Sequence, residues 1–239
     1  MKNYKYFGMA LLGLLFAACD DADDLLNQYV DQGPIVYAGK IDTLNMQSGY
    51  YRARVNIYPA EDVNRAYCIL SWNISSGLKD SLRVDYIKDN YDAELGCYYA
   101  VVPFENVEGN VLISAKNVDS FGNTSLINDQ GAFIYGTSYV STLINAPVHV
   151  AETLDALVFE ERIGAVGNLI SYEQADGSFT EEVFVTENIY PLVNAKPGGL
   201  IRSKTRYLIT ETDLDTLVSD TYLETQIAYE EDEILAEEI

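Results

Sequence analysis

Apolar and polar residues alternate along most of the chain after residue 33, and Gly, Asn, Asp and Pro separate the alternating runs. A period of two is typical of half-buried β-strands. In the first part of the chain it predicts strands at Ile35–Lys40, Tyr51–Tyr58, Arg65–Asn73, Ser81–Ile87, Cys97–Pro103, Val111–Asn117 and Ala132–Tyr139. Seven short strands within about a hundred residues indicate a β-sandwich.

A second unit repeats this pattern at residues 149–225, after a linker at residues 145–148 in which Pro147 favours extended backbone. Two of its predicted strands, Asn168–Gln174 and Phe179–Thr186, flank Asp176-Gly177, which is a strong hairpin signal. A further strand is predicted at Leu200–Thr210. We therefore expect an all-β chain with one sandwich at residues 33–144 and a second sandwich-like domain at 149–225.

Three basic residues, Arg202, Lys204 and Arg206, alternate onto one face of the strand predicted at Leu200–Thr210. One interpretation is an anion-binding site. The other is cross-strand pairing with acidic neighbours such as Glu181 or Glu187, which is a modest contribution to sheet stability.

The N-terminus carries Lys2 and Lys5, then an apolar run that ends just before Cys19. The run is too short to span a membrane, which takes about 20 residues, and it has the features of a secretory signal. With its cysteine, it resembles the lipobox of bacterial lipoproteins. That resemblance implies a signal peptide at 1–18 and a lipid on Cys19, whose two or three acyl chains would attach it durably to the outer membrane. The alternative is an ordinary secretion signal with an incidental cysteine.

The segment Asp20-Asp21-Ala22-Asp23-Asp24 begins a predicted acidic tether at residues 19–32. It resembles the export signal of Bacteroidota lipoproteins and so implies a lipid-anchored outer-membrane protein exposed at the cell surface. A periplasm-facing orientation is the alternative.

The net charge of −22 argues against nucleic acid and anionic lipid surfaces as partners. Apolar residues make up 48% of the chain, which is enough for real cores. The acidity therefore belongs to surfaces, to the tether and to an acidic tail at residues 226–239, rather than to general disorder.

No catalytic motif is present, and we expect neither enzyme activity nor a cofactor. The single histidine, His149, has no partners at zinc-ligand spacing. Asp89–Glu94 offers oxygen ligands at alternate positions but lacks the glycine and final glutamate of a calcium loop, so a solvated turn is the better interpretation. Cys68 and Cys97 could form a disulfide in an exported protein, or remain small buried thiols.

The segment Ala115–Ser125 resembles the region between the last two strands of fibronectin type III-like domains, where Asp, Asn and Gly shape the turn. A wider resemblance, to a Bacteroidota lipoprotein family of the same build, is carried by Gly33–Lys40, Tyr67–Asn73, Tyr135–Tyr139 and Lys196–Gly199. It covers roughly residues 33–225 and implies tandem immunoglobulin- or fibronectin type III-like β-sandwiches. It brings no catalytic residues.

Three short motifs, each an Asp followed by Ser or Thr and an aliphatic residue, resemble the O-glycosylation sequon of exported Bacteroidota proteins. They imply modification at Thr43, Ser81 and Thr216, although such pairs are also ordinary at strand edges.

Nineteen tyrosines suggest a carbohydrate platform, because aromatic faces stack on sugars, but tyrosine is also common in strands. We expect a surface-anchored, non-catalytic accessory protein that captures glycan for an outer-membrane uptake system. The alternative is a structural spacer or protein–protein interaction module without a small ligand, whose partner would be a membrane protein. A flat cluster of outward tyrosines would favour glycan binding, whereas scattered tyrosines would favour the spacer.

Overall fold

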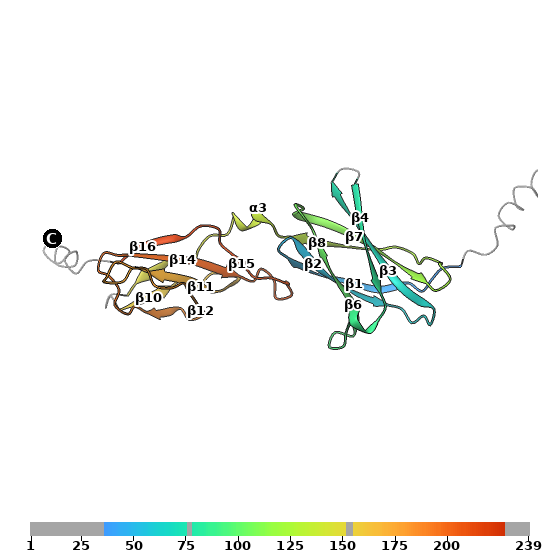
Figure 1. The fold of residues 1–239 in the computed structure, drawn as a ribbon, viewed down its shortest axis with the longest axis horizontal. Helices are drawn as coiled ribbons and strands as arrows, with labels where there is room; N and C mark the ends of the chain where they lie inside the picture. The colour runs from blue at the N-terminus through green and yellow to red at the C-terminus, as the bar shows by residue number, and fades with distance from the viewer. Residues whose placement is uncertain (1–35, 76–77, 152–154, 228–239) are drawn as a thin grey trace, which may run out of the picture.

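Antiparallel strand pairing organises the described part of the chain, which in this computed structural model comprises residues 36–75, 78–151 and 155–227. Two β-sandwiches follow one another along the long axis of the molecule (Figure 1). The predicted all-β class with tandem sandwiches is confirmed. The signal peptide at 1–18, Cys19 and the tether at 19–32 lie outside the described residues, as does the predicted tail from residue 228 onward.

The N-terminal sandwich consists of two four-stranded sheets, ordered β1-β2-β6-β5 and β4-β3-β7-β8. The strands of the first sheet are β1 (Ile41–Gly49), β2 (Arg52–Pro59), β6 (Cys97–Pro103) and β5 (Tyr91–Asp92). Those of the second are β4 (Leu78–Asp85), β3 (Arg65–Ser75), β7 (Gly109–Asp119) and β8 (Asn128–Ile134). A 3₁₀ turn, η1 (Lys88–Asn90), precedes β5, and a short helix, α3 (Thr137–Val140), follows β8.

The C-terminal sandwich repeats this strand order. One sheet contains β13 (Ile189–Pro191), β10 (Ala156–Phe159) and β9 (Val148–Val150). The other contains β12 (Val183–Val185), β11 (Ala165–Tyr172), β14 (Leu200–Tyr207), β15 (Leu217–Val218) and β16 (Leu223–Gln226). When the two-residue strand β5 is left out of the count, the two sandwiches have the same order. The first, second and fifth strands form one sheet, and the fourth, third, sixth and seventh form the other. In the C-terminal copy the seventh is split into β15 and β16, and both pieces pair with β14.

Alternating burial along the strands builds one core in each sandwich. On β3, Leu70 is fully buried and Trp72 is 5% exposed, and the Trp72 ring packs edge-on against Phe104 with 5.6 Å between ring centroids. In the C-terminal sandwich, Leu157 and Ile201 are fully buried in opposite sheets. Burying side chains of this size stabilises the fold by about 1.5–3 kcal/mol each relative to exposure.

Two strand predictions were displaced along the chain. The first strand was expected at Ile35–Lys40 but runs from Ile41 to Gly49, where a β-bulge between Ile41 and Thr43 interrupts the alternation that sequence reading depends on. The strand expected at Ala132–Tyr139 is β8, which begins earlier, at Asn128, on a polar stretch that pairs with β7. It ends at Ile134, and α3 occupies much of the remaining predicted range.

The two described cysteines are free and buried, so the structure contains separate thiols rather than the candidate disulfide. Cys68 lies on β3 and Cys97 on β6, in opposite sheets of the N-terminal sandwich. Burial raises the pKa of the Cys68 thiol to about 12, and hydrogen bonding to Tyr86 and to the Lys116 backbone offsets this only in part.

A lipid-free chain of residues 33–239 should therefore show no reactive thiol while folded. Thiol reagents attack the thiolate, and at pH 8 Cys68 is neutral while both cysteines are at most 1% exposed. Titration with a chromogenic disulfide reagent should give two thiols after unfolding in guanidinium without reductant. Finding none after unfolding would mean that the cysteines are bridged.

Candidate functional site

In residues 36–75, 78–151 and 155–227, no group of three or more His, Cys, Asp or Glu could hold a metal ion. His149 is exposed on β9. In the calcium candidate, the Asp92 carboxylate accepts hydrogen bonds from the Leu95 and Glu94 amides and an ion pair from Arg54. The Leu95 amide is the main reason why the pKa of Asp92 is lowered. The Asp92 carboxylate is thus already bonded to other groups of the protein.

The three candidate glycosylation residues, Thr43 on β1, Ser81 on β4 and Thr216 before β15, are all exposed. They lie on different parts of the molecule. Asp80 accepts a hydrogen bond from the Ser81 amide at 2.8 Å, whereas Asp215 is engaged by the other sandwich, as described below. The modification itself stays a prediction.

The exposed tyrosines are scattered. Among the described residues, the clearly exposed ones are Tyr37, Tyr50, Tyr91 and Tyr222. They lie before β1, in the β1–β2 turn, on β5 and before β16, so they form no common flat surface. Because a glycan platform would need a flat cluster of outward tyrosines, this scattered distribution favours the spacer or interaction module.

The cationic stripe, Arg202, Lys204 and Arg206, follows the outward face of β14. Arg202 forms an ion pair with Glu224 on the neighbouring strand β16 at 3.0 Å. The cross-strand acidic partner expected from the sequence is thus Glu224, and no ion pair in the described part of the chain joins the stripe to Glu181 or Glu187.

The segment predicted as a linker is bound to the C-terminal sandwich. The Asn145 side chain accepts a hydrogen bond from the Thr205 amide at 2.8 Å and donates one to the Thr221 carbonyl at 2.8 Å. The Ala146 amide donates to the Thr205 hydroxyl at 2.7 Å, and Tyr207 donates to the Ile144 carbonyl. The predicted linker is therefore fixed to the C-terminal sandwich by hydrogen bonds and is not a free hinge.

The principal candidate site is the junction between the sandwiches, where the β14–β15 loop (residues 208–216) contacts the β1–β2 turn. The Leu214 amide donates to the Ser48 carbonyl at 2.7 Å. Tyr135, next to β8, donates its hydroxyl to Asp213 at 3.0 Å. Burial, and then the bond to Asp213, raises the pKa of Tyr135, so this hydroxyl keeps its proton.

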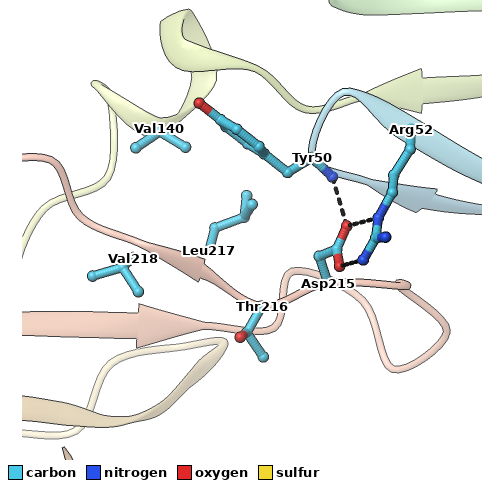
Figure 2. A pocket seen from close by; sticks show the side chains of 7 residues that line it. All are labelled: Tyr50, Arg52, Val140, Asp215, Thr216, Leu217 and Val218. Atoms are coloured by element: carbon cyan, nitrogen blue, oxygen red, sulfur yellow. Dashed lines mark hydrogen bonds and ion pairs between the residues drawn. The ribbon is translucent and has the colours of Figure 1, made fainter. Parts of the chain in front are cut away.

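Asp215 makes the most contacts in this junction (Figure 2). Its carboxylate accepts the Tyr50 amide and the Arg52 Nε, both at 2.9 Å, and pairs with the Arg52 Nη2 through its second oxygen. The hydrogen bond from Arg52 is the main cause of the lowered pKa of Asp215. Gly49 makes room for this carboxylate, because a Cβ at that position would lie 2.6 Å from the Asp215 Oδ2.

An open hollow of about 510 Å³ lies beside this ion pair, lined by Tyr50, Arg52, Val140, Asp215, Thr216, Leu217 and Val218 (Figure 2). Its walls come from both sandwiches and from α3. The polar groups of Asp215 and Arg52 are paired with each other, so the arrangement is suited to holding the two modules together.

Tandem β-sandwiches with a shared strand order define the structural class of this chain. The chain belongs to the family of the domain of unknown function DUF4998, which matches residues 19–217. No curated protein matches it.

Solved structures that match include the chicken CNTN1 FN1–FN3 domains, with 14% identity and a TM-score of 0.34, covering 80% of this chain and 69% of that one. A segment of two fibronectin type III domains from chicken tenascin matches with 12% identity and a TM-score of 0.32, covering 78% of this chain and 99% of that one. At these scores, the fold description rests on the strand order of the two sandwiches.

Replacing Asp215 by Asn should loosen the junction without unfolding either sandwich. A partly exposed ion pair contributes about 0.2–1 kcal/mol, so the separated population should rise at most about fivefold. The lowered pKa of Asp215 means that the pairing is complete above the ordinary aspartate pKa of about 3.9 and is lost as the pH falls through the lower, paired value. Wild-type protein should therefore loosen only in acid below about pH 4.

Backbone ¹⁵N relaxation would detect a loosened junction as more independent tumbling of the two sandwiches. Gly49→Ala should have the same effect by steric conflict with Asp215. Asp42→Asn is the matched control, since Asp42 pairs with Lys40 within the N-terminal sandwich at 3.0 Å. Unchanged tumbling in both junction variants would show that these contacts do not hold the modules.

Proposed function

We propose that this chain is a non-catalytic structural or protein-interaction module in which two sandwiches act as one extended unit. The observation that carries the proposal is the junction, where the β14–β15 loop contacts the β1–β2 turn through Leu214, Asp213 and Asp215. A short linker bound to one module and a loop bound to the other fix the direction in which the second sandwich points. Such a unit is suited to presenting a surface at a set distance from its point of attachment.

Glycan capture is the competing function, and the aromatic side chains support it less well. The exposed tyrosines are scattered. Tyr222 shares one region of the C-terminal sandwich with two exposed phenylalanines, Phe179 and Phe184. Each of these three rings is covered by a cation of the stripe at 4.3–4.6 Å from the ring centroid. A ring face that already holds a guanidinium or ammonium group is not free to stack on a sugar.

The attachment point in this proposal is a lipid on Cys19, which lies outside the described residues. Residues 19–35 would then separate the lipid from the N-terminal sandwich, and the C-terminal sandwich would point away from the membrane. The acidic residues after Cys19 support display at the outer surface of the cell.

A glycan-array and affinity-gel screen of residues 33–239, purified without lipid, distinguishes the two functions. We expect no retention by any glycan, because no free aromatic platform is present among the described residues. Reproducible binding that is lost in Tyr50→Ala or Tyr222→Ala would overturn the proposal and establish glycan capture. Tyr190→Ala, at a half-buried position beside the C-terminal core, separates loss of a ligand contact from general destabilisation.

Cys19→Ala should abolish the membrane attachment. When the full precursor is produced in a bacterium that processes lipoproteins, the wild type should incorporate labelled palmitate and sediment with the outer membrane. The variant should do neither. Cys68→Ala is the matched control and should still be labelled, because Cys68 is buried in the sandwich. Labelling that persists in Cys19→Ala would contradict the anchor.

A further inference from the structure

The end of the N-terminal sandwich that points away from the C-terminal one is built from three segments. They are residues 36–40 ahead of β1, the β2–β3 loop at residues 60–64 and the β7–β8 loop at residues 120–127 (Figure 1). Hydrogen bonds join the three. The Ala38 amide donates to the Thr124 carbonyl at 3.3 Å, and the Ser120 amide donates to the Asn64 carbonyl at 2.8 Å. Side chains from the three segments therefore share one surface.

Large apolar side chains are exposed on this surface. Val63 is 99% exposed and Phe121 is 77% exposed, although loops usually present polar groups to water. Single exposed apolar residues are ordinary, but a group of them in one place marks a surface that contacts a partner or a membrane. We call this group the apolar pole, and it comprises Val36, Tyr37, Val63, Phe121, Leu126 and Ile127.

The fold does not depend on the aromatic ring at the tip of the β7–β8 loop. The Asp119 carboxylate accepts the amides of Phe121 and Asn123 at 2.9 and 2.8 Å, and Gly122 supplies a positive φ of 86°. These contacts use the backbone of the loop and the Asp119 side chain, so they would form equally well with a polar residue in place of Phe121. The ring is therefore available for a contact outside the fold.

The charges of the pole limit what can cover it. Asp62 accepts the Gly39 and Asn64 amides at 2.9 and 2.8 Å, so its carboxylate is used within the pole, as is that of Asp119. Glu61, in the same loop as Asp62, is exposed. An anionic bilayer would repel this surface and a chain of net charge −22, whereas a zwitterionic bilayer would not.

The place of the pole in the chain favours a bilayer as its partner. In the proposed function a lipid on Cys19 attaches the protein to the membrane, and residues 20–35 separate that cysteine from Val36. Sixteen residues span at most about 60 Å, and a tether of this length keeps the pole at a high local concentration beside the bilayer. Tyrosine and large apolar side chains are favoured at the boundary between headgroups and acyl chains.

We propose that the apolar pole docks into the headgroup region of a zwitterionic lipid bilayer and inserts Val63 and Phe121. This inference rests on the proposed attachment through Cys19. Docking gives the molecule one orientation, in which the pole contacts the membrane and the C-terminal sandwich projects from it.

Tryptophan fluorescence of lipid-free residues 33–239 on vesicles tests the docking separately from the lipid. An N-terminal histidine tag holds the chain on phosphatidylcholine vesicles that contain a nickel-chelating lipid, so the tag takes the place of the Cys19 lipid. Phe121→Trp puts a reporter on the pole, while the native Trp72 is buried in the core. We expect its emission to shift to shorter wavelength on the vesicles and to be quenched by lipids that are brominated in the acyl chains.

Ile163→Trp is the matched control, because Ile163 is fully exposed in the β10–β11 loop of the C-terminal sandwich. Its emission should not change on the vesicles. Val63→Asp in the Phe121→Trp background should reduce the shift, since it places a charge on the docking surface at a position that the core does not use. Replacing part of the phosphatidylcholine by anionic phosphatidylglycerol should reduce the shift as well.

Unchanged emission of Phe121→Trp on vesicles that have captured the chain would overturn the proposal and leave a protein as the partner of the pole. Equal quenching of Ile163→Trp would also overturn it, because the chain would then touch the bilayer without a preferred end. The lipid anchor fails separately. Absence of palmitate on Cys19 would reject the anchor, whereas the tagged chain would still report whether the pole docks.

Discussion

The inward hydroxyl of Thr205 is the constraint on which the geometry of the C-terminal sandwich and its linker depends. Thr205 is fully buried in the middle of β14, where a polar group must be hydrogen-bonded. Its hydroxyl donates to the Asn168 side chain on β11 and accepts the Ala146 amide, and its own amide donates to Asn145. One residue therefore joins the third and sixth strands of the sandwich to the linker that enters it.

Because the linker is bound, the junction can be held by weak contacts. The Arg52–Asp215 pair is partly exposed and is worth about 0.2–1 kcal/mol, and a backbone bond such as Leu214 to Ser48 adds about 0.5–1.5 kcal/mol. These energies are too small to order a long flexible linker, whose residues each cost about 1–2 kcal/mol to fix. Here that ordering is already achieved by Asn145 and Ala146, so a few contacts suffice to orient the modules.

The sequence predicted the strands well wherever burial alternates strictly, as on β14. It also predicted the Asp176-Gly177 turn, but the strand expected after it at Phe179–Thr186 is limited to Val183–Val185. Gly177 adopts a positive φ of 84° in the predicted Asp176-Gly177 hairpin. The bulge in β1 and the polar start of β8 were missed because neither shows this alternation. The junction could not be predicted either, since Asp215 and Arg52 are 163 residues apart and no local pattern connects them.

Scarce cations also explain how so acidic a chain remains ordered. Of its 15 lysines and arginines, several cross-link separate parts of the fold: Arg52 joins the two sandwiches, and Arg54 fixes the β5 turn through Asp92. Arg202 joins β14 to β16 through Glu224. Against this pattern, Lys204 and Arg206 stand out, because each is positioned by a ring yet has no carboxylate partner among the described residues.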